Sequence, residues 1–264
     1  MADNLDYAFA VGKIRALERF LIRREVFEEA LDAELQDALK LFVESDSYSE
    51  KLLHVSTSGE LENVLSEELK SVVNLVSRLL RDKKLLELLT SEDLSACRSI
   101  ANECGSGFLS DYFTHMTDMY NIKTLLRLRL LKEPKTKCEA LITAGGFLQR
   151  KELIKLYDQD MNNLLHRLEY VHKRGQIVNY AFYLKNSIEK AEKTLSFISL
   201  EKAIADFLME ILKPAHYVSF GPEPVLAYYF AKVNEINLIR MIILVKLNTM
   251  PVDVARERMN TVYA

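Results

Sequence analysis

Apolar side chains recur at helical spacing along almost the whole chain. In residues 7–22 they form one broad stripe, made of Phe9, Val11, Ile14, Leu17 and Leu21. Asp6 stands where it could cap this helix. Only 8 glycines and 5 prolines interrupt the 264 residues, fewer than the turns of a large sheet need. The pattern predicts an all-α, multi-helix body.

Clusters of Gly, Pro, Ser and Asn divide this pattern into segments. Residues 25–45 predict one or two short helices, and residues 60–90 predict a longer one. The whole chain predicts about nine to twelve helices, given a mean helix of about three turns. The breaks fall at residues 45–50, 54–60, 102–107, 131–137, 143–147, 172–176, 212–224 and 247–251.

The longest apolar stretch is residues 225–248, VLAYYFAKVNEINLIRMIILVKLN. A bilayer span needs about twenty largely uncharged residues. Four charges interrupt this stretch, at Lys232, Glu235, Arg240 and Lys246. A membrane span is therefore excluded, and a helix with its MIILV run buried on nearly all sides is predicted.

Charge is unevenly distributed along the chain. The net charge is -3, which argues against a nucleic-acid surface. Residues 25–68 hold thirteen Asp/Glu and two Lys/Arg, whereas residues 133–264 hold fifteen and eighteen. This asymmetry favours oriented protein contacts, with solvated helix faces as the alternative for any single run.

The sequence offers no recognisable cofactor, metal or catalytic site. Cys97, Cys104 and Cys138 form no C-x-x-C pair, which fits a reducing cytoplasm. The start, MADNLDYAFA, lacks the basic and apolar regions of a signal peptide. No glycine pair is followed by the Lys-Ser/Thr of a phosphate loop. The histidines form no H-x-x-x-H pair; they are His54, His115, His166, His172 and His216.

Three segments align without gaps: residues 10–21 (AVGKIRALERFL), 118–129 (DMYNIKTLLRLR) and 235–246 (EINLIRMIILVK). Each has an isoleucine followed by a base. The second and third also begin with an acid and end with a base. The polar positions are Lys13 and Arg15 in the first; Asp118, Asn121, Lys123, Arg127 and Arg129 in the second; and Glu235, Arg240 and Lys246 in the third.

The acid and the middle base of a segment cannot form a simple pair within one helix. Five residues turn a helix through about 500°, so Asp118 and Lys123 point about 140° apart, as do Glu235 and Arg240. Each charge is expected to meet another helix, solvent or a partner protein. Periodicity alone leaves a chance alignment open, since three helices rich in Leu, Ile and Lys also align this well.

The stretch GPEPVLAYYFAKVNEINLIRMIILVKLNTMPVDVARERM, residues 221–259, resembles the C-terminal signature of the C/d-subunit family of V-type ATPases, whose members cap the rotor of A/V-type rotary ATPases. Residues 109–131 resemble its acid-x-x-Asn-Ile-Lys helix, and residues 141–157 resemble the glycine-rich turn and helix that follow. Residues 6–31 complete the match. The resemblance favours a true repeat.

The resemblance implies a funnel of three helical lobes about a pseudo-threefold axis. We expect an N-terminal lobe in residues 1–60, a compressed or partial second lobe in residues 61–110, and a C-terminal region in residues 111–264 that carries the family motifs. One lobe is expected to be reduced, because the chain is short for the family and the acid-x-x-Asn-Ile-Lys motif occurs clearly once. Leu238 stands where Asn121 stands in the middle segment.

The resemblance also implies a non-catalytic rotor subunit without a cofactor. It would link the central-shaft subunits to the membrane proteolipid ring and transmit torque for ion pumping or ATP synthesis, in single copy, in the cytoplasm and peripheral to the membrane. The candidate residues for partner contact, or alternatively for ion pairs between lobes, are Lys13, Arg15, Asp118, Asn121, Lys123, Arg127, Glu235, Arg240 and Lys246. A soluble helical scaffold or a helical enzyme unrelated to the ATPase is the alternative, and an enzyme would show a pocket with converging carboxylates or histidines.

Overall fold

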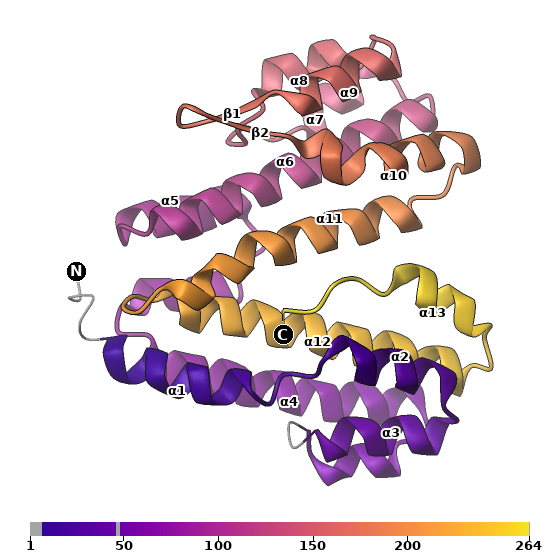
Figure 1. Cartoon of the computed structure of the whole chain (residues 1–264). Helices are drawn as coiled ribbons and strands as arrows, with labels where there is room; N and C mark the ends of the chain where they lie inside the picture. The colour runs from indigo at the N-terminus through magenta and orange to yellow at the C-terminus, as the bar shows by residue number, and fades with distance from the viewer. Residues whose placement is uncertain (1–6, 46–47, 264) are drawn as a thin grey trace. The chain divides into compact units, whose positions relative to one another are not determined.

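The structure, a computed structural model, describes residues 7–45 and 48–263 (Figure 1). Helices make up most of the described chain, and the predicted all-α class is confirmed. The chain divides into two compact units. Unit 1 is residues 1–90 together with 209–264, and unit 2 is residues 91–208.

In unit 1 the two ends of the sequence share one core. Helix α12 (Glu223–Leu247) packs against α1, α2, α3, α4 and α13 (Figure 1). Ile239 and Ile243 of α12 lie in the same fully buried cluster as Phe27 and Phe42. The other elements are α1 (Ala8–Glu18), α2 (Arg24–Asp32), α3 (Leu35–Glu44), α4 (Ser58–Leu79), α13 (Val252–Arg258) and the 3₁₀ helices η2 (Glu50–His54), η3 (Lys83–Leu89) and η4 (Lys213–Tyr217).

Helix α12 contains nearly all of the long apolar stretch, residues 225–248. Its buried positions lie on all sides, and Ile242, Ile243 and Val245 of the MIILV run are among them, so the prediction of a buried helix is confirmed. Nowhere in residues 7–45 and 48–263 is a helix both long enough and apolar enough to cross a membrane.

Unit 2 is organised around α6 (Gly107–Leu130), which packs against α5, α7 and α8. The other elements are α5 (Leu94–Glu103), α7 (Lys135–Leu141), α8 (Arg150–Leu156), α9 (Met161–Glu169), the strands β1 (Val171–Lys173) and β2 (Gln176–Val178), α10 (Tyr180–Thr194) and most of α11 (Ile198–Leu212). The last residues of α11 belong to unit 1.

The predicted break at residues 172–176 is a β-hairpin. Strands β1 and β2 pair antiparallel, with His172 opposite Ile177. The turn between them has positive φ at Arg174 (46°) and Gly175 (85°), the backbone that a two-residue hairpin of this twist requires. Glycine adopts it freely, whereas Arg174 does so at a cost.

Two helix predictions need correction at their edges. Phe9, placed on the buried stripe of α1, is 74% exposed, because the buried face of this short helix consists of Ala10, Val11 and Ile14. The predicted helix over residues 60–90 ends at Leu79, where the backbone becomes extended before η3. Asp6, the predicted cap of the first helix, lies outside the described residues.

The predicted lobes do not coincide with the two units. The unit boundaries fall after residue 90 and after residue 208, rather than at residues 60 and 110. The units are defined by contacts within the chain, whereas the lobes were expected from the family resemblance, so the units do not test the lobes. The three-lobed, pseudo-threefold arrangement therefore stays a prediction.

Helix α4 begins with a reciprocal cap that the sequence motif T-x-x-E specifies. The Thr57 hydroxyl accepts the backbone N–H of Glu60 at 3.2 Å, and the Glu60 carboxylate accepts the N–H of Thr57 at 3.1 Å. We expect Thr57→Ala to lower the free energy of unfolding of the chain by about 0.5–2 kcal/mol. Urea denaturation followed by circular dichroism measures this loss.

Ser66→Ala is the matched control, because Ser66 is exposed within the same helix. It should change stability by less than about 0.5 kcal/mol. Equal losses in the two variants would contradict a capping role for Thr57.

Candidate functional site

The acid that begins the third repeated segment is buried in unit 1. One Glu235 oxygen accepts the backbone N–H of Ile22 at 2.7 Å, and the other accepts the Tyr48 hydroxyl at 2.7 Å. The Lys232 ammonium forms an ion pair with the second oxygen and lies 4.2 Å from the centre of the Tyr48 ring. The Lys232 and Glu235 side chains are only 5% and 4% exposed. This cluster, here called the unit 1 clasp, binds α12 to the segment that precedes α2.

The acid of the second segment makes an equivalent clasp in unit 2. Asp118 Oδ2 accepts the N–H of Phe147 at 3.0 Å and the Tyr180 hydroxyl at 2.8 Å, and Oδ1 accepts the N–H of Leu148 at 3.1 Å. The Tyr180 oxygen also lies 2.7 Å from Nδ1 of His115. In each clasp, one buried carboxylate on the long helix accepts the hydroxyl of one tyrosine and backbone N–H groups of another segment, one in unit 1 and two in unit 2.

Burial controls the ionisation of the unit 2 clasp. It raises the pKa of Asp118 to about 7, although the bonds from Tyr180 and the two backbone N–H groups oppose this shift. Burial also lowers the pKa of His115 to about 3, with a smaller contribution from Lys173. His115 is therefore neutral at physiological pH.

A glycine turn lets the backbone approach Asp118. A Cβ on Gly146 would collide with the Asp118 carboxylate. Asn121, one helical turn further along α6, holds the same turn: its oxygen accepts the N–H of Thr143 at 2.9 Å and its amide donates to the Thr143 carbonyl at 2.9 Å. In α12 the equivalent position is Leu238, a buried residue whose apolar side chain cannot form such hydrogen bonds.

The bases that end the second and third repeated segments bind carbonyl groups at the end of a short helix. Lys246 donates at the end of α2, and Arg129 donates at the end of α8. The acceptors are Leu31 and Ala33 for Lys246, and Leu156 and Gln159 for Arg129. A cation is favourable there, since the last carbonyls of a helix lack partners within it.

The short helices that receive these bases are themselves equivalent. Helix α2 begins at residue 24 and α3 at residue 35, while α8 begins at residue 150 and α9 at residue 161, so both pairs are related by the same shift of 126 positions. Five pairs of buried residues also align under this shift, while buried Leu31 corresponds to half-buried Tyr157. The five pairs are formed by Phe27, Ala30, Ala38, Leu39 and Phe42 with Leu153, Leu156, Leu164, Leu165 and Leu168, in this order. We call each set of one long and two short helices a module: α12 with α2 and α3 in unit 1, where the long helix comes last in the chain, and α6 with α8 and α9 in unit 2. The three helices pack against one another in unit 1, whereas α9 packs chiefly against α10 in unit 2.

The middle bases bind other helices, as their angular separation from the acids predicted. Arg240 pairs with Glu62 of α4 at 2.9 Å. Lys123 and Arg127 share Glu201 of α11, at 3.8 and 2.6 Å. These pairs are partly exposed, so each contributes only about 0–1 kcal/mol. The prediction that the acid and the middle base of one segment do not pair with each other within the helix is confirmed.

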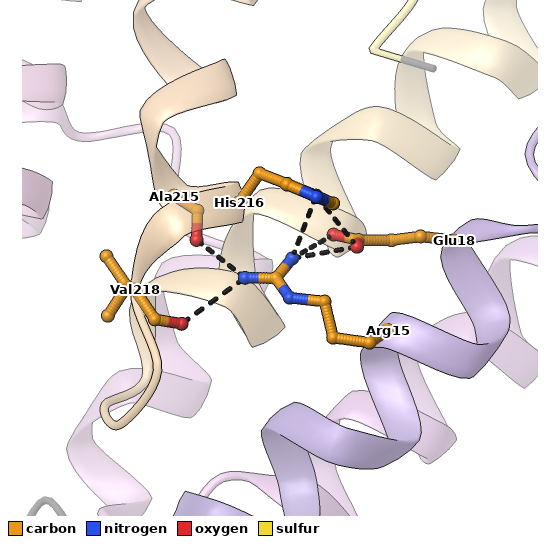
Figure 2. Close-up of polar contacts among 5 residues, drawn as sticks. All are labelled: Arg15, Glu18, Ala215, His216 and Val218. Carbon is orange, nitrogen blue, oxygen red and sulfur yellow. Dashed lines mark hydrogen bonds and ion pairs between the residues drawn. The ribbon is translucent and has the colours of Figure 1, made fainter.

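The first repeated segment, on α1, lacks a clasp because Ala10 stands in place of the acid. Its Arg15 instead binds a loop near the other end of the sequence (Figure 2). The guanidinium donates to the carbonyls of Ala215 and Val218 at 2.9 and 3.3 Å and pairs with Glu18 at 2.7 Å. His216 Nδ1 lies 3.2 Å from the same carboxylate. Arg15 thus fixes η4 to α1 within unit 1.

Comparison with known proteins identifies the family of this chain. Residues 92–258 match the family described as ATP synthase (C/AC39) subunit. The chain belongs to this family. The C subunit of the V-type sodium ATPase of Enterococcus hirae is 23% identical over 227 residues, which cover 84% of this chain and 66% of that relative. The chain therefore spans about two thirds of the length of the relative, and the family resemblance is confirmed.

Most candidate residues of this C/AC39 chain bind groups within their own units. Asp118 and Asn121 hold the glycine turn of unit 2, and Glu235 and Lys246 hold the module of unit 1. Lys13 is exposed on α1. Whether any of the nine candidates contacts a partner stays a prediction.

Sequence reasoning missed the residues that complete the clasps: Tyr48, Tyr180, Lys232 and His115. The two tyrosines carry no local signal, because they reach the acids from other elements. The other two had one: Lys232 and His115 each lie three residues before the acid, on the same helical face. The described residues also contain no group of three His, Cys, Asp or Glu side chains that could hold a metal ion.

The glycine turn of unit 2 predicts a steric effect. We expect Gly146→Ala to lower the free energy of unfolding by about 1–3 kcal/mol, because the new methyl group displaces a buried, hydrogen-bonded carboxylate. Gly59→Ala is the control, since nothing lies within 4 Å of a Cβ at Gly59 in α4, and it should stabilise the chain by about 0.5–1 kcal/mol. Urea denaturation measures both, and a loss no larger at Gly146 than at Gly59 would contradict the close approach.

The unit 1 clasp predicts a large effect of charge removal. Glu235→Gln leaves the Lys232 ammonium buried without its counter-charge, so we expect a loss of about 3–5 kcal/mol in the free energy of unfolding. Glu62→Gln makes the same change in the exposed pair with Arg240 and should cost about 0–1 kcal/mol. The measurement is urea denaturation, and similar losses in both variants would argue against a buried ion pair.

Proposed function

We propose that this chain is a non-catalytic central-stalk subunit of a V-type rotary ATPase. It links the central-shaft subunits to the membrane proteolipid ring and transmits torque for ATP-driven ion pumping or ATP synthesis. It acts in the cytoplasm, peripheral to the membrane through the complex, in single copy. The family match over residues 92–258 carries this proposal, and the similarity to the sodium ATPase protein of Enterococcus hirae supports it.

The clasps supply the stiffness that torque transmission requires. In each unit the long helix is bound to other segments at three positions along its length: at the buried acid, at the middle base and at the terminal base. In unit 1 these bonds join α12 to segments roughly two hundred residues earlier in the chain. Slack between such segments would waste the free energy stored in rotation, whereas close-packed helices have low compressibility.

The candidate residues fall into two groups under this proposal. Buried Asp118, Asn121 and Glu235 hold the modules together. Exposed Lys13 on α1 is the better candidate for contact with a partner; Arg127 is also exposed but pairs with Glu201 of its own unit. Arg15, Lys123, Arg240 and Lys246 are intermediate in exposure and already bind groups within their own units.

A second candidate surface is acidic. The side chains of Glu25, Glu29, Glu34 and Glu44, on α2, α3 and the link between them, are exposed. Arg23, Arg24 and Lys40 are exposed on or beside the same elements, so this segment carries an excess of acidic groups and not a surface of one sign. An excess of one charge orients a partner of the opposite charge, and we propose that this segment of unit 1 helps to orient the chain in the complex.

The enzyme alternative has less support. A cavity of about 260 Å³ in unit 2 is lined by Glu92, Asp93, Ser95, Thr117, Tyr120 and Thr143, among others. Its carboxylates are neighbours in sequence, and the side chain of Asp93 caps α5 through the N–H groups of Ser95 and Ala96. The arrangement fits a helix start better than a set of converging acid and base groups.

Co-expression with the shaft and ring subunits of the same source tests the function. We expect the chain to co-purify with both on an affinity tag placed on a shaft subunit. Recovery of a folded chain that never enters a complex with either would contradict the proposal.

Lys13→Glu tests the surface assignment in the same assay. The reversed charge is expected to reduce the recovered complex by about two- to fivefold, the effect of an exposed interface charge of about 0.5–1 kcal/mol. Lys151→Glu, exposed on α8, is the matched control and should not change recovery. Unchanged thermal unfolding must accompany the loss; equal recovery of both variants would remove Lys13 from the interface.

A further inference from the structure

The two clasps differ at one equivalent position. Lys232 lies three residues before Glu235, and His115 lies three residues before Asp118. Both are buried, and both contact the tyrosine that donates to the carboxylate. Unit 1 therefore has an ammonium group where unit 2 has a neutral imidazole.

The imidazole gives the unit 2 clasp two consistent hydrogen-bond arrangements. With Asp118 ionised, the Tyr180 hydroxyl donates to Oδ2, and Nδ1–H of His115 donates to the Tyr180 oxygen. With Asp118 protonated at Oδ2, the carboxyl donates to the Tyr180 oxygen, and the Tyr180 hydroxyl donates to an unprotonated Nδ1. The distances of 2.8 and 2.7 Å suit both arrangements, because each group can act as donor and acceptor.

The unit 1 clasp has only one of these arrangements. An ammonium has three donors and no acceptor. Lys232 can therefore only donate, and its ammonium pairs with the Glu235 oxygen that also accepts the Tyr48 hydroxyl. Tyr48 has no acceptor at that position to which it could redirect its hydroxyl.

We propose that the chain of hydrogen bonds Asp118–Tyr180–His115 is a buried proton-binding site, which takes up one proton from solvent at Asp118, and that Lys232 removes this capacity from the clasp of unit 1. The proton adds to Oδ2, the Tyr180 hydroxyl turns from Asp118 to His115, and the imidazole exchanges its Nδ1 proton for one at Nε2. The net change is one bound proton. This inference does not depend on the rotor function.

The surroundings of Asp118 fit this behaviour. Burial raises its pKa to about 7 against the Tyr180, backbone and Arg167 contributions that lower it. Arg167 is itself paired with Glu152, and Lys173, which faces His115, is paired with Asp111. The groups that face the clasp are His115 of α6, Tyr180 of α10, Arg167 of α9, Lys173 of β1, Arg98 of α5 at the carbonyl of Gly145, and the ring of Phe207 on α11.

The titration of the Asp118 carboxyl carbon in the full chain, followed by NMR with ¹³C-labelled aspartate, tests the proposal directly. We expect a midpoint near pH 7, far above that of the exposed aspartates. A midpoint below pH 5 would overturn the proposal.

Placing a lysine at residue 115 and a histidine at residue 232, in separate variants, tests the role of His115. His115→Lys brings the unit 1 arrangement into unit 2 and should lower the Asp118 midpoint by about one to three pH units. Lys232→His, the reciprocal control, should leave the Asp118 midpoint unchanged. An unchanged midpoint in His115→Lys would overturn the role given to the imidazole.

Asp118→Asn provides a test that does not depend on the lysine variant folding. Its amide nitrogen can donate to the Tyr180 oxygen as the protonated acid does, and its oxygen can still accept the Leu148 N–H, but the bond from the Phe147 N–H is lost. The variant is therefore expected to fold with a lower melting temperature, and the test compares the slopes of the two pH profiles. Because the folded-state pKa of Asp118 is raised above its unfolded value, its contribution to stability is present below about pH 4 and is lost as pH rises through about 7. The melting temperature of the wild type should therefore fall relative to Asp118→Asn over this range, and parallel profiles would overturn the proposal.

Discussion

A buried carboxylate that holds the backbone of a distant segment organises each half of this molecule. Removing a carboxylate from water costs several kcal/mol unless donors replace its hydration. Glu235 and Asp118 each have three such donors, one of which is a tyrosine hydroxyl. Since a shift of one residue would leave the acid unpaired, the clasp sets the register of the long helix against its neighbours. The middle and terminal bases then add bonds that depend on this register.

The sequence predicted the helices and the polar positions of the long helices, but not their partners. The acid, the middle base and the terminal base are visible because the spacing on one helix is fixed by its period. The same seven positions are buried in residues 118–128 and 235–245, which explains why two of the three aligned segments proved equivalent. The tyrosines and the Ile22 and Leu148 backbone contacts depend on tertiary structure, and no local pattern indicates them.

The short helices of the two modules, α2 and α3 in unit 1 and α8 and α9 in unit 2, correspond in position although few of their residues are identical. Residues 22–42 and 148–168 agree in identity only at Arg24, Asp32 and Leu39 and their counterparts. Yet their helices begin at equivalent positions and bury equivalent side chains. Burial constrains only size and polarity, so the apolar pattern survives while the residues change. The order of the elements differs as well, because α12 follows its short helices in the chain whereas α6 precedes them, and a search for gapless repeats does not find this relation.

The residue three positions before each acid, Lys232 in unit 1 and His115 in unit 2, explains the remaining differences between the two clasps. In unit 1 Lys232 supplies both a donor and a compensating charge, so one backbone N–H, from Ile22, completes the set. In unit 2 a neutral His115 supplies neither to the carboxylate, and two consecutive N–H groups take its place. Two consecutive N–H groups can reach one carboxylate only where the chain comes very close to α6, and a Cβ at Gly146 would prevent that approach. The glycine turn of unit 2 is thus the structural counterpart of the lysine of unit 1.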